Sequence, residues 1–337
     1  MNAVRLGIIG CGIVARDVHW PVLEQLKEKF AIVHVSSRSE HKAQDFAKLT
    51  GAKRYSTDYQ ELLQDPEVEA VVIAYPFEMN YTITQAALEA GKHVLVEKPV
   101  AGTLDEAEKM VRLSEATTLV AAVAENYRYR PIFSRIKAFI EEGRIGKPCK
   151  VIWNSFGYLP RDFKYIADST WRKSSHGGFI LDGGVHQMAG LRMIFGNMVK
   201  GIAYTTQMQD GVGEPDGITF QFEFENKVSG TYNSYLSIIG YEYKNLLIFG
   251  TEGTIIVDNK FKDVTIATAD KREIETIVDD GGYLGEFEDF YEAVRNGSLT
   301  KSSFREAYYD LQACIFALES TGKWKDFTMA PLGKSPF

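Results

Sequence analysis

A lysine that follows a buried strand has the chemistry to stabilise charge on a substrate oxygen. Lys98 stands in Glu97-Lys98-Pro99, after the apolar run Val94–Val96, which is predicted to be a parallel strand. Ligands bind at the carboxyl ends of such strands, where a lysine can hydrogen-bond an oxygen that gains negative charge during carbonyl reduction. Because proline lowers the cost of a cis bond, we expect a cis Lys98–Pro99 peptide. On its own, such a tripeptide is more often a surface turn.

An aspartate and a histidine four residues apart form the second candidate group. Asp182 and His186 follow the glycines Gly177 and Gly178, and on a helix they would face the same way. His186 suits proton exchange near neutral pH, and Asp182 would orient it or bind a substrate hydroxyl. The spacing is equally common in structural helices. No third ligand stands nearby, so we expect no metal.

A glycine-rich turn after the first predicted strand indicates a dinucleotide site. Gly10-Cys11-Gly12-Ile13-Val14-Ala15 has the form GxGxxA. The first glycine allows a tight turn, the second lets the backbone approach a pyrophosphate, and the small last residue lets the helix pack closely on the strand. The helix that follows offers N–H groups to the phosphates, so we expect contacts from Gly10, Gly12, Ile13 and Val14.

The end of the second predicted strand favours NADP(H) over NAD(H). An NAD site usually places a carboxylate here to bind the ribose 2′-hydroxyl, whereas this chain has Ser37 followed by Arg38. The planar, permanently charged guanidinium suits a 2′-phosphate, and Ser39 and Lys42 would add contacts. Alternatively, Arg38 is a solvated surface charge or stacks on adenine without selecting a cofactor.

Polar and aromatic residues before Asp182 are candidates for lining the substrate pocket. Tyr158, Arg161 and Lys164 lie on a predicted loop, and Trp171 and Arg172 would frame the cofactor or substrate or else pack within the second domain. His176 is also on a loop. The other histidines are interpreted as surface or packing residues: His19, His34, His41 and His93.

Strands and helices alternate over the first third of the chain and predict a doubly wound parallel sheet. This domain is expected to span residues 1–124. A capping box at Thr103 and a cap at Asp58 mark two of its helix starts. Its predicted strands are Val4–Ile9, Ile32–Val35, Ala70–Ala74, Val94–Val96 and Leu119–Ala124, and its helices include Val22–Lys29, His41–Leu49, Tyr81–Ala90 and Thr103–Ser114.

Strand patterns dominate the remaining chain, which we assign to an α+β domain over 125–337. Hairpin signals between them predict a large, mostly antiparallel open sheet. The predicted helices are Pro131–Glu142, Leu181–Phe195, Leu284–Arg295 and Phe304–Thr321. The predicted strands are Lys150–Phe156, Gly201–Gln207, Ile218–Glu225, Ser229–Ile239, Asn245–Phe249, Gly253–Val257 and Val264–Thr268.

Composition narrows the range of partners. The 337 residues suffice for about two domains, and 38 basic against 45 acidic side chains give a net charge of −7. This mildly acidic balance argues against non-specific nucleic-acid binding, so a small-molecule partner is expected. No apolar run approaches the length of a membrane span. Cys11, Cys149 and Cys314 form no pair motif and are expected to be reduced, buried thiols of a cytoplasmic protein.

Together these motifs resemble the Gfo/Idh/MocA family (glucose–fructose oxidoreductase, inositol dehydrogenase and rhizopine catabolism) over nearly the whole length. The segments that carry the likeness are Gly10–Ala15, Ala90–Pro99, Trp171-Arg172, Gly177–His186, Gly250–Thr254 and Phe287–Gly297. The resemblance implies a Rossmann domain, a C-terminal α+β domain whose sheet forms a homodimer or higher oligomer, and a lysine–aspartate–histidine set, carried here by Lys98, Asp182 and His186. It places this chain near the NADP-dependent members.

Two departures from the family pattern concern the cofactor contacts. After the third strand the family has Thr-Pro-Asn followed by a histidine, whereas this chain has Ala74-Tyr75-Pro76 and then Asn80. The resemblance implies cofactor contacts from Ala74, Tyr75, Pro76, Asn80, Glu97, Lys98 and Asn126, and a substrate contact from Tyr127.

We expect reversible hydride transfer between nicotinamide C4 and a CH–OH or carbonyl carbon of a sugar, polyol or small aldehyde or ketone. His186 would exchange the hydroxyl proton, Lys98 would hold the oxygen, and Tyr158 and Asp182 would contact the substrate. One alternative is a catalytically inactive NADP-binding regulator of the same fold. Another is an enzyme that keeps its cofactor bound for internal redox, such as glycoside cleavage.

Overall fold

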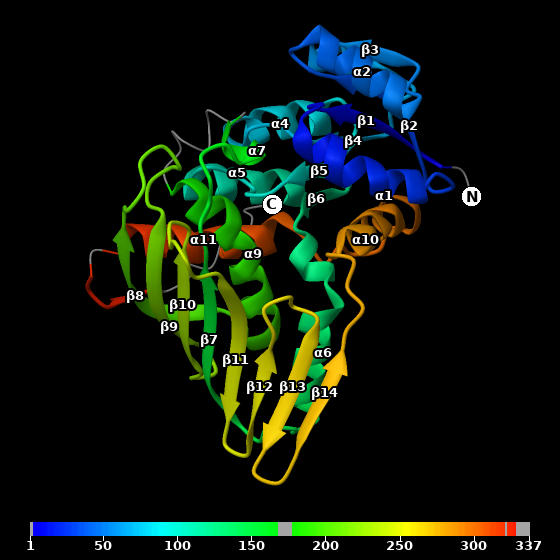
Figure 1. Cartoon of the computed structure of the whole chain (residues 1–337). Coiled ribbons are helices and arrows are strands. Elements are labelled where there is room, and N and C mark those ends of the chain that lie inside the picture. The colour runs from blue at the N-terminus through cyan, green and yellow to red at the C-terminus, as the bar shows by residue number, and fades with distance from the viewer. Residues whose placement is uncertain (1–2, 168–176, 321, 328–337) are drawn as a thin grey trace. The chain divides into compact units, whose positions relative to one another are not determined.

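The chain divides into two compact units in a computed structural model that describes residues 3–167, 177–320 and 322–327. The first unit contains the chain up to Tyr129 and the segment Gly282–Tyr308. The second contains Arg130–Gly281 and the described residues from Tyr309 onward. Figure 1 labels the elements of both units.

The first unit is built on a parallel sheet of six strands in the order β3-β2-β1-β4-β5-β6, which is the Rossmann order. This confirms the doubly wound sheet predicted from the sequence. The strands are β1 Val4–Ile9, β2 Phe30–Ser36, β3 Arg54–Ser56, β4 Ala70–Ile73, β5 His93–Glu97 and β6 Ala121–Ala124. The helices are α1 Trp20–Gln25, α2 Glu40–Thr50, α3 Tyr59–Gln64, α4 Asn80–Glu89 and α5 Leu104–Glu115, with a π-helical turn η1 Ala15–His19 and 3₁₀ turns η2 Phe77–Met79 and η3 Asn126–Tyr129.

The helix-capping residues predicted from the sequence cap helices in the structure. The side chain of Asp58 accepts a hydrogen bond from the Gln60 amide at the start of α3, and Thr103 accepts one from the Glu106 amide at the start of α5. Gly51 ends α2 with φ 74°. The first helical segment differs from its prediction, because it begins with η1 and α1 ends at Gln25 rather than at Lys29.

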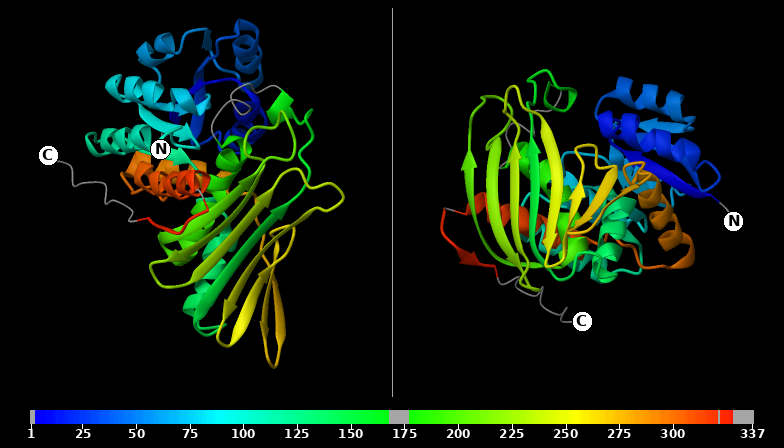
Figure 2. Two further views of the ribbon diagram at one scale, coloured as in Figure 1. Left: turned by 90° about the vertical axis from the view of Figure 1, so that its left-hand side faces the viewer. Right: turned by 60° about the horizontal axis from the view of Figure 1, so that its bottom comes forward.

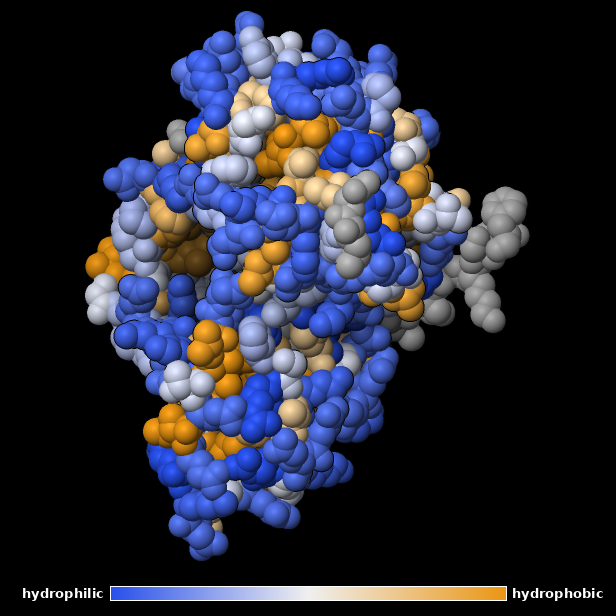
Figure 3. All heavy atoms as spheres, turned by 90° about the vertical axis from the view of Figure 1, so that its right-hand side faces the viewer, coloured by the Kyte–Doolittle hydropathy of each residue, from blue (hydrophilic) through white to orange (hydrophobic). Residues whose placement is uncertain are grey.

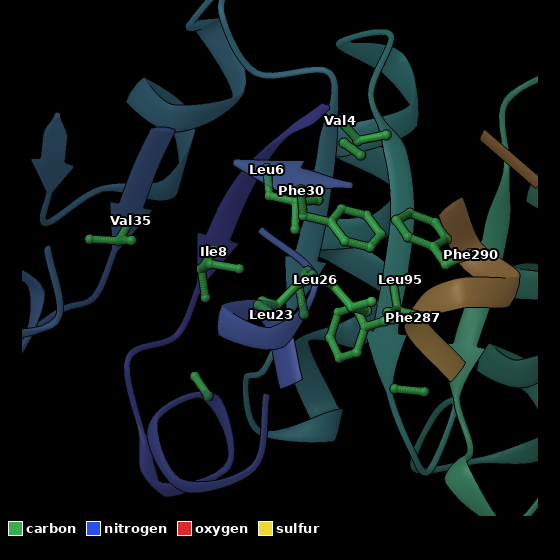
Figure 4. Close-up of a cluster of buried hydrophobic side chains, with 14 of the residues drawn as sticks. Val4, Leu6, Ile8, Leu23, Leu26, Phe30, Val35, Leu95, Phe287 and Phe290 are labelled. Carbon is green, nitrogen blue, oxygen red and sulfur yellow. The ribbon is translucent and has the colours of Figure 1, made fainter. Parts of the chain in front are cut away.

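A helix from late in the chain completes the core of the first unit. Helix α10 (Tyr283–Asn296) packs beside α1 and buries Phe287, Phe290 and Tyr291 against β-strand residues. Figure 4 shows Phe287 and Phe290 pointing toward Phe30 and the side chains of α1 and β1. The first unit therefore includes Gly282–Tyr308, which the predicted boundary after residue 124 assigns to the second domain.

The second unit is a nine-stranded sheet in the order β14-β13-β12-β11-β7-β10-β9-β8-β15. Every neighbouring pair is antiparallel except β7 and β10, which confirms the mostly antiparallel prediction. Figure 2 shows the long strands side by side, with helices against one face. The strands are β7 Pro148–Phe156, β8 Met198–Thr206, β9 Gly217–Phe224, β10 Ser229–Tyr235, β11 Tyr243–Gly250, β12 Gly253–Val257, β13 Asp263–Thr268, β14 Arg272–Thr276 and β15 Lys325–Asp326.

Helices α6 Pro131–Glu141, α9 Gly178–Phe195 and most of α11 Phe304–Glu319 cover the face of the second unit's sheet that carries its core (Figure 2). The short helix α7 Lys164–Ala167 also belongs to this unit. Helices α6 and α9 pack closely because Gly190 has no side chain: a Cβ there would lie 2.9 Å from the ring of Phe133. Val151 and Trp153 of β7 are buried on this face.

The surface is mostly polar on the face drawn in Figure 3, with small apolar patches among hydrophilic residues. None of the described helices is long and apolar enough to cross a bilayer. The prediction of three buried thiols is wrong for Cys149, which is exposed, whereas Cys11 and Cys314 are buried. Cys149 lies at the start of β7, before the stretch in which Val151 and Trp153 enter the core.

Candidate functional site

The glycine turn after β1 has the shape that a bound pyrophosphate requires. Gly10 has φ +101°, and a Cβ there would lie 2.2 Å from the carbonyl oxygen of Ala74, so only glycine fits. At Gly12 a Cβ would meet no heavy atom within 4 Å, which leaves its backbone open to a ligand. Ala15 is fully buried behind the turn. These residues fit a dinucleotide; Ile13 and Val14 are half-buried beside them.

Arg38 and Tyr75 face each other where β2 and β4 end. The Arg38 guanidinium lies over the Tyr75 ring, 5.4 Å from its centre. Burial raises the pKa of the Tyr75 hydroxyl, although the positive charge of Arg38 opposes this shift. Ser39 caps α2 by accepting a hydrogen bond from the Lys42 amide, and Lys42 itself is exposed. The structure thus places a cation and an aromatic ring beside the predicted adenosine end of the site.

The turn that carries Lys98 follows β5 directly. The Lys98–Pro99 bond is cis, as predicted from the sequence. The amide nitrogen of Asn80 donates one hydrogen bond to the carbonyl of Glu97 and one to the carbonyl of Pro99, both at 2.9 Å. Asn80 is completely buried. Its Nδ2 thus binds the backbone on both sides of Lys98, and the cofactor contact that the resemblance implies for Asn80 stays a prediction.

A buried histidine holds the side chain of Glu97, a contact that the sequence did not reveal. His19 is 1% exposed, and its Nε2 lies 2.8 Å from Oε1 of Glu97. Its ring packs edge-on against Phe287, with ring centres 5.3 Å apart. His19 packs in the core, as expected, but it also binds the carboxylate of Glu97, the residue before Lys98. The sequence offered one hint of this contact: His19 lies in the helical segment that follows the glycine turn.

Glu286 interacts electrostatically with Glu97 of this pair and with a further glutamate, Glu125. Glu286 of α10 is buried, and neither of its carboxyl oxygens has a hydrogen-bond partner among the described residues. Burial raises the pKa of Glu286 well above its usual value, and the charges of Glu97 and Glu125 raise it further. Both effects favour the neutral form of Glu286. Glu125 is also buried, and it accepts a hydrogen bond from the Tyr127 amide.

In the second unit, Asp182 and His186 lie one turn apart on α9, which confirms the predicted helix. Asp182 is 6% exposed and His186 is half-buried. Gly177 begins the helix with φ +83°, and its amide donates to the Glu214 carbonyl. A Cβ on Gly178 would lie 3.1 Å from Gly213, so the start of α9 needs glycine to approach this loop.

The remaining predicted residues have different surroundings. Tyr158 is half-exposed and pairs across a β-bridge with Ser237. Arg161 and Lys164 are exposed. Asn126 is buried in η3, Tyr127 is half-buried there, and Pro76 is half-buried at the end of β4. Trp171, Arg172 and His176 lie outside the described residues.

The structure brings the glycine turn, the Arg38–Tyr75 pair and the Lys98 turn to the carboxyl ends of β1, β2, β4 and β5 in one sheet. Asp182 and His186 share one helix of the second unit. Among the described residues no group of three or more His, Cys, Asp or Glu side chains could hold a metal ion. This is a two-unit protein with a dinucleotide-binding Rossmann sheet and a lysine at its ligand-binding edge.

The chain belongs to the Gfo/Idh/MocA family of oxidoreductases. Residues 4–125 match the model described as "Oxidoreductase family, NAD-binding Rossmann fold", and residues 133–256 match the Gfo/Idh/MocA C-terminal domain. The recognition made from the motifs is thereby confirmed, as is a fold that binds a nicotinamide dinucleotide.

Three relatives extend the comparison. An uncharacterized protein of Saccharomyces cerevisiae is 35% identical, with the alignment covering 97% of this chain and 98% of that protein. The 1,5-anhydro-D-fructose reductase of Ensifer adhaerens is 29% identical over 80% of both chains. The crystal structure of an oxidoreductase from Thermotoga maritima superimposes with a TM-score of 0.90 at 33% identity, covering 96% of this chain and 98% of that one.

Proposed function

We propose that this protein is an NADP(H)-dependent oxidoreductase acting on a CH–OH or carbonyl carbon of a sugar, polyol or small aldehyde or ketone. The observation that carries this proposal is the lysine turn after β5, in the same sheet as the glycine turn after β1. Substrates of this class are favoured because a relative, 29% identical, is a reductase of 1,5-anhydro-D-fructose.

The bound nicotinamide would accept or supply the hydride, which carries two electrons. Lys98 holds the substrate oxygen and stabilises the negative charge that develops on it. During oxidation of an alcohol the hydroxyl proton passes to His186, and during reduction the same imidazole returns it. Asp182 fixes a substrate hydroxyl or the imidazole. Tyr158 and Tyr127 contact the substrate.

The preference for NADP(H) rests on the end of β2. Ser37 stands where an acidic residue would bind the 2′-hydroxyl, and the Arg38 guanidinium is available for a 2′-phosphate. A charge-assisted hydrogen bond contributes about 1.5–3 kcal/mol. Arg38→Ala should therefore weaken NADPH binding about 10- to 100-fold and leave NADH binding nearly unchanged. Equal Kd values of the wild-type protein for the two cofactors would refute this part.

Homodimer formation through the sheet of the second unit is part of the proposal. Ile152, Leu247 and Ile256 are partly exposed and stand in register on three neighbouring strands, on the face opposite the buried Val151. Light scattering on Leu247→Lys and on the wild-type protein tests this role. A dimer that persists at micromolar concentration in the variant would argue against this strip as the contact.

The activity is tested by following NADPH oxidation against a panel of aldoses, ketoses and small aldehydes. Lys98→Met and His186→Ala should lose at least about 100-fold in kcat, while NADPH binding persists. Near-normal turnover in either variant would overturn the assignment of that residue. Tight NADPH binding without turnover on any substrate would instead favour a regulatory protein.

A further inference from the structure

Two buried side chains outside β5 bind the turn that carries Lys98. His19, at the end of η1, binds the carboxylate of Glu97 at 2.8 Å. Asn80, at the start of α4, donates to the carbonyls of Glu97 and Pro99 at 2.9 Å each. The residues before and after Lys98 are therefore fixed through one side chain and two backbone oxygens.

We propose that His19 and Asn80 are positioning residues for Lys98, which they hold through Glu97 and the backbone of the Glu97–Pro99 turn. The inference rests on the proposed function, because it assumes that Lys98 acts on the substrate. Neither residue needs to touch the substrate or the cofactor. Their effect would be to fix where the Lys98 ammonium lies, since a catalytic group misplaced by about 1 Å can cost about 100-fold in rate.

The surroundings of His19 prevent the imidazole from moving elsewhere. Its ring is 1% exposed and packs edge-on against Phe287. A carboxylate only accepts hydrogen bonds, so Nε2 of His19 carries the hydrogen that Glu97 accepts. Glu97 itself is only 14% exposed, and losing this partner would leave a largely buried carboxylate uncompensated.

Glu286, which interacts electrostatically with Glu97, does not compete with it for the hydrogen bond to His19. Glu286 is buried without a hydrogen-bond partner among the described residues, and burial raises its pKa, which disfavours a second negative charge beside Glu97. The charged partner of His19 is therefore Glu97 alone among the contacts in the described part of the chain. This makes the His19–Glu97 bond the contact to remove in a test.

Matched substitutions separate positioning from general stability. His19→Leu removes the donor, whereas His19→Gln keeps an N–H near the place of Nε2. His34→Leu is the control, because His34 is also a buried histidine of the first unit bound to a carboxylate, Asp65, at 3.0 Å. Asn80→Leu removes both bonds to the turn.

Two measurements are made on each variant of the full-length protein. The first is backbone amide hydrogen exchange of residues 94–101, which needs no substrate. The second is kcat and KM with NADPH and a substrate from the panel. We expect His19→Leu and Asn80→Leu to speed exchange in this segment and to lower kcat about 10- to 100-fold, with KM for NADPH changed less than about threefold. His19→Gln should recover most of both losses, and His34→Leu should show neither.

Exchange and kcat in His19→Leu that match the wild type, or that match His34→Leu, would overturn the inference. If the wild-type protein has no turnover, or if Lys98→Met retains it, the proposed function fails instead. In that case the exchange measurement alone decides whether His19 and Asn80 hold the turn.

Discussion

Replacing Glu286 by glutamine should stabilise the protein, and the gain should grow as the pH rises. The Glu286 side chain is buried in the first unit without a hydrogen-bond partner among the described residues. Burial, and then the charges of Glu97 and Glu125, raise its pKa well above 4.5. The folded protein therefore binds a proton at Glu286 that the unfolded chain releases once the pH exceeds its ordinary carboxyl pKa.

The sign and size of the effect follow from this difference in proton binding. Because the folded pKa is raised, the contribution of Glu286 to stability is complete below the unfolded pKa and is lost as the pH rises toward the folded pKa. The loss is about 1.4 kcal/mol per pH unit while the folded group stays protonated. Between about pH 5.5 and about pH 7 the wild-type protein loses up to about 2 kcal/mol from this group. Glu286→Gln binds no such proton, so it should gain that amount relative to the wild type.

Urea unfolding of both proteins across this pH range measures the difference directly. Glu288→Gln on the same helix is the control, since that side chain is 44% exposed and its carboxylate pairs with Lys29 at 3.0 Å. We expect no comparable gain there. A difference between Glu286→Gln and wild type that stays constant from about pH 5.5 to about pH 7 would show that Glu286 is not held neutral, and would refute the reasoning.

Three other outcomes are expected. Although burial raises it, hydrogen bonds from the Glu67 amide and His34, together with Arg54, hold the pKa of Asp65 below its usual value. Stability from Asp65 is thus present above the unfolded pKa of 3.8 and lost as the pH falls through the folded pKa, so Asp65→Asn should lower the thermal midpoint at neutral pH and flatten its decline in acid. Burial raises the pKa of Cys11 to about 12 despite Arg16, so a thiol reagent at neutral pH should label the exposed Cys149 and spare Cys11. Gly190→Ala should cost about 1–3 kcal/mol in urea unfolding, because its Cβ would press on Phe133; an unchanged midpoint would mean that α6 and α9 separate freely.

Local patterns predicted most strands of both sheets, because buried strands are marked by continuous or alternating apolar residues. Val4–Ile9 has the predicted bounds. The strands that were missed lack this mark: β14 has the sequence REIET, and its Ile274 is 66% exposed. Such a strand is defined by its pairing with β13 rather than by its own side chains. Sequence periodicity carries no information on pairing of that kind.

The unit to which α10 belongs could not be predicted from the pattern of its own residues. Its apolar face was visible as a helical pattern, but an amphipathic helix does not reveal which core it will join. Phe287 and Phe290 pack with Phe30 in the first unit, although more than 150 residues of the second unit intervene. A single boundary along the chain cannot represent a domain completed by a distant segment.

The candidate site was predictable where its residues are adjacent in sequence. The glycine turn, Ser37-Arg38 and Glu97-Lys98-Pro99 are each short motifs with a local physical meaning. The contacts that hold the Lys98 turn join His19, Asn80 and Glu97 across nearly 80 residues, and no spacing rule connects them. A buried histidine with a carboxylate partner is indistinguishable in sequence from one that only packs.

Substitutions of His19 and Glu286, which both interact with Glu97, separate the effects of stability and of positioning on turnover. Burial raises the pKa of Glu286, so we expect its removal to stabilise the fold at neutral pH. His19 binds the charged Glu97, so its removal leaves a buried carboxylate and loosens the turn. If general stability governed activity, Glu286→Gln would raise turnover and His34→Leu would lower it as much as His19→Leu does. If the position of Lys98 governs activity, His19→Leu is the one of these three substitutions that lowers kcat.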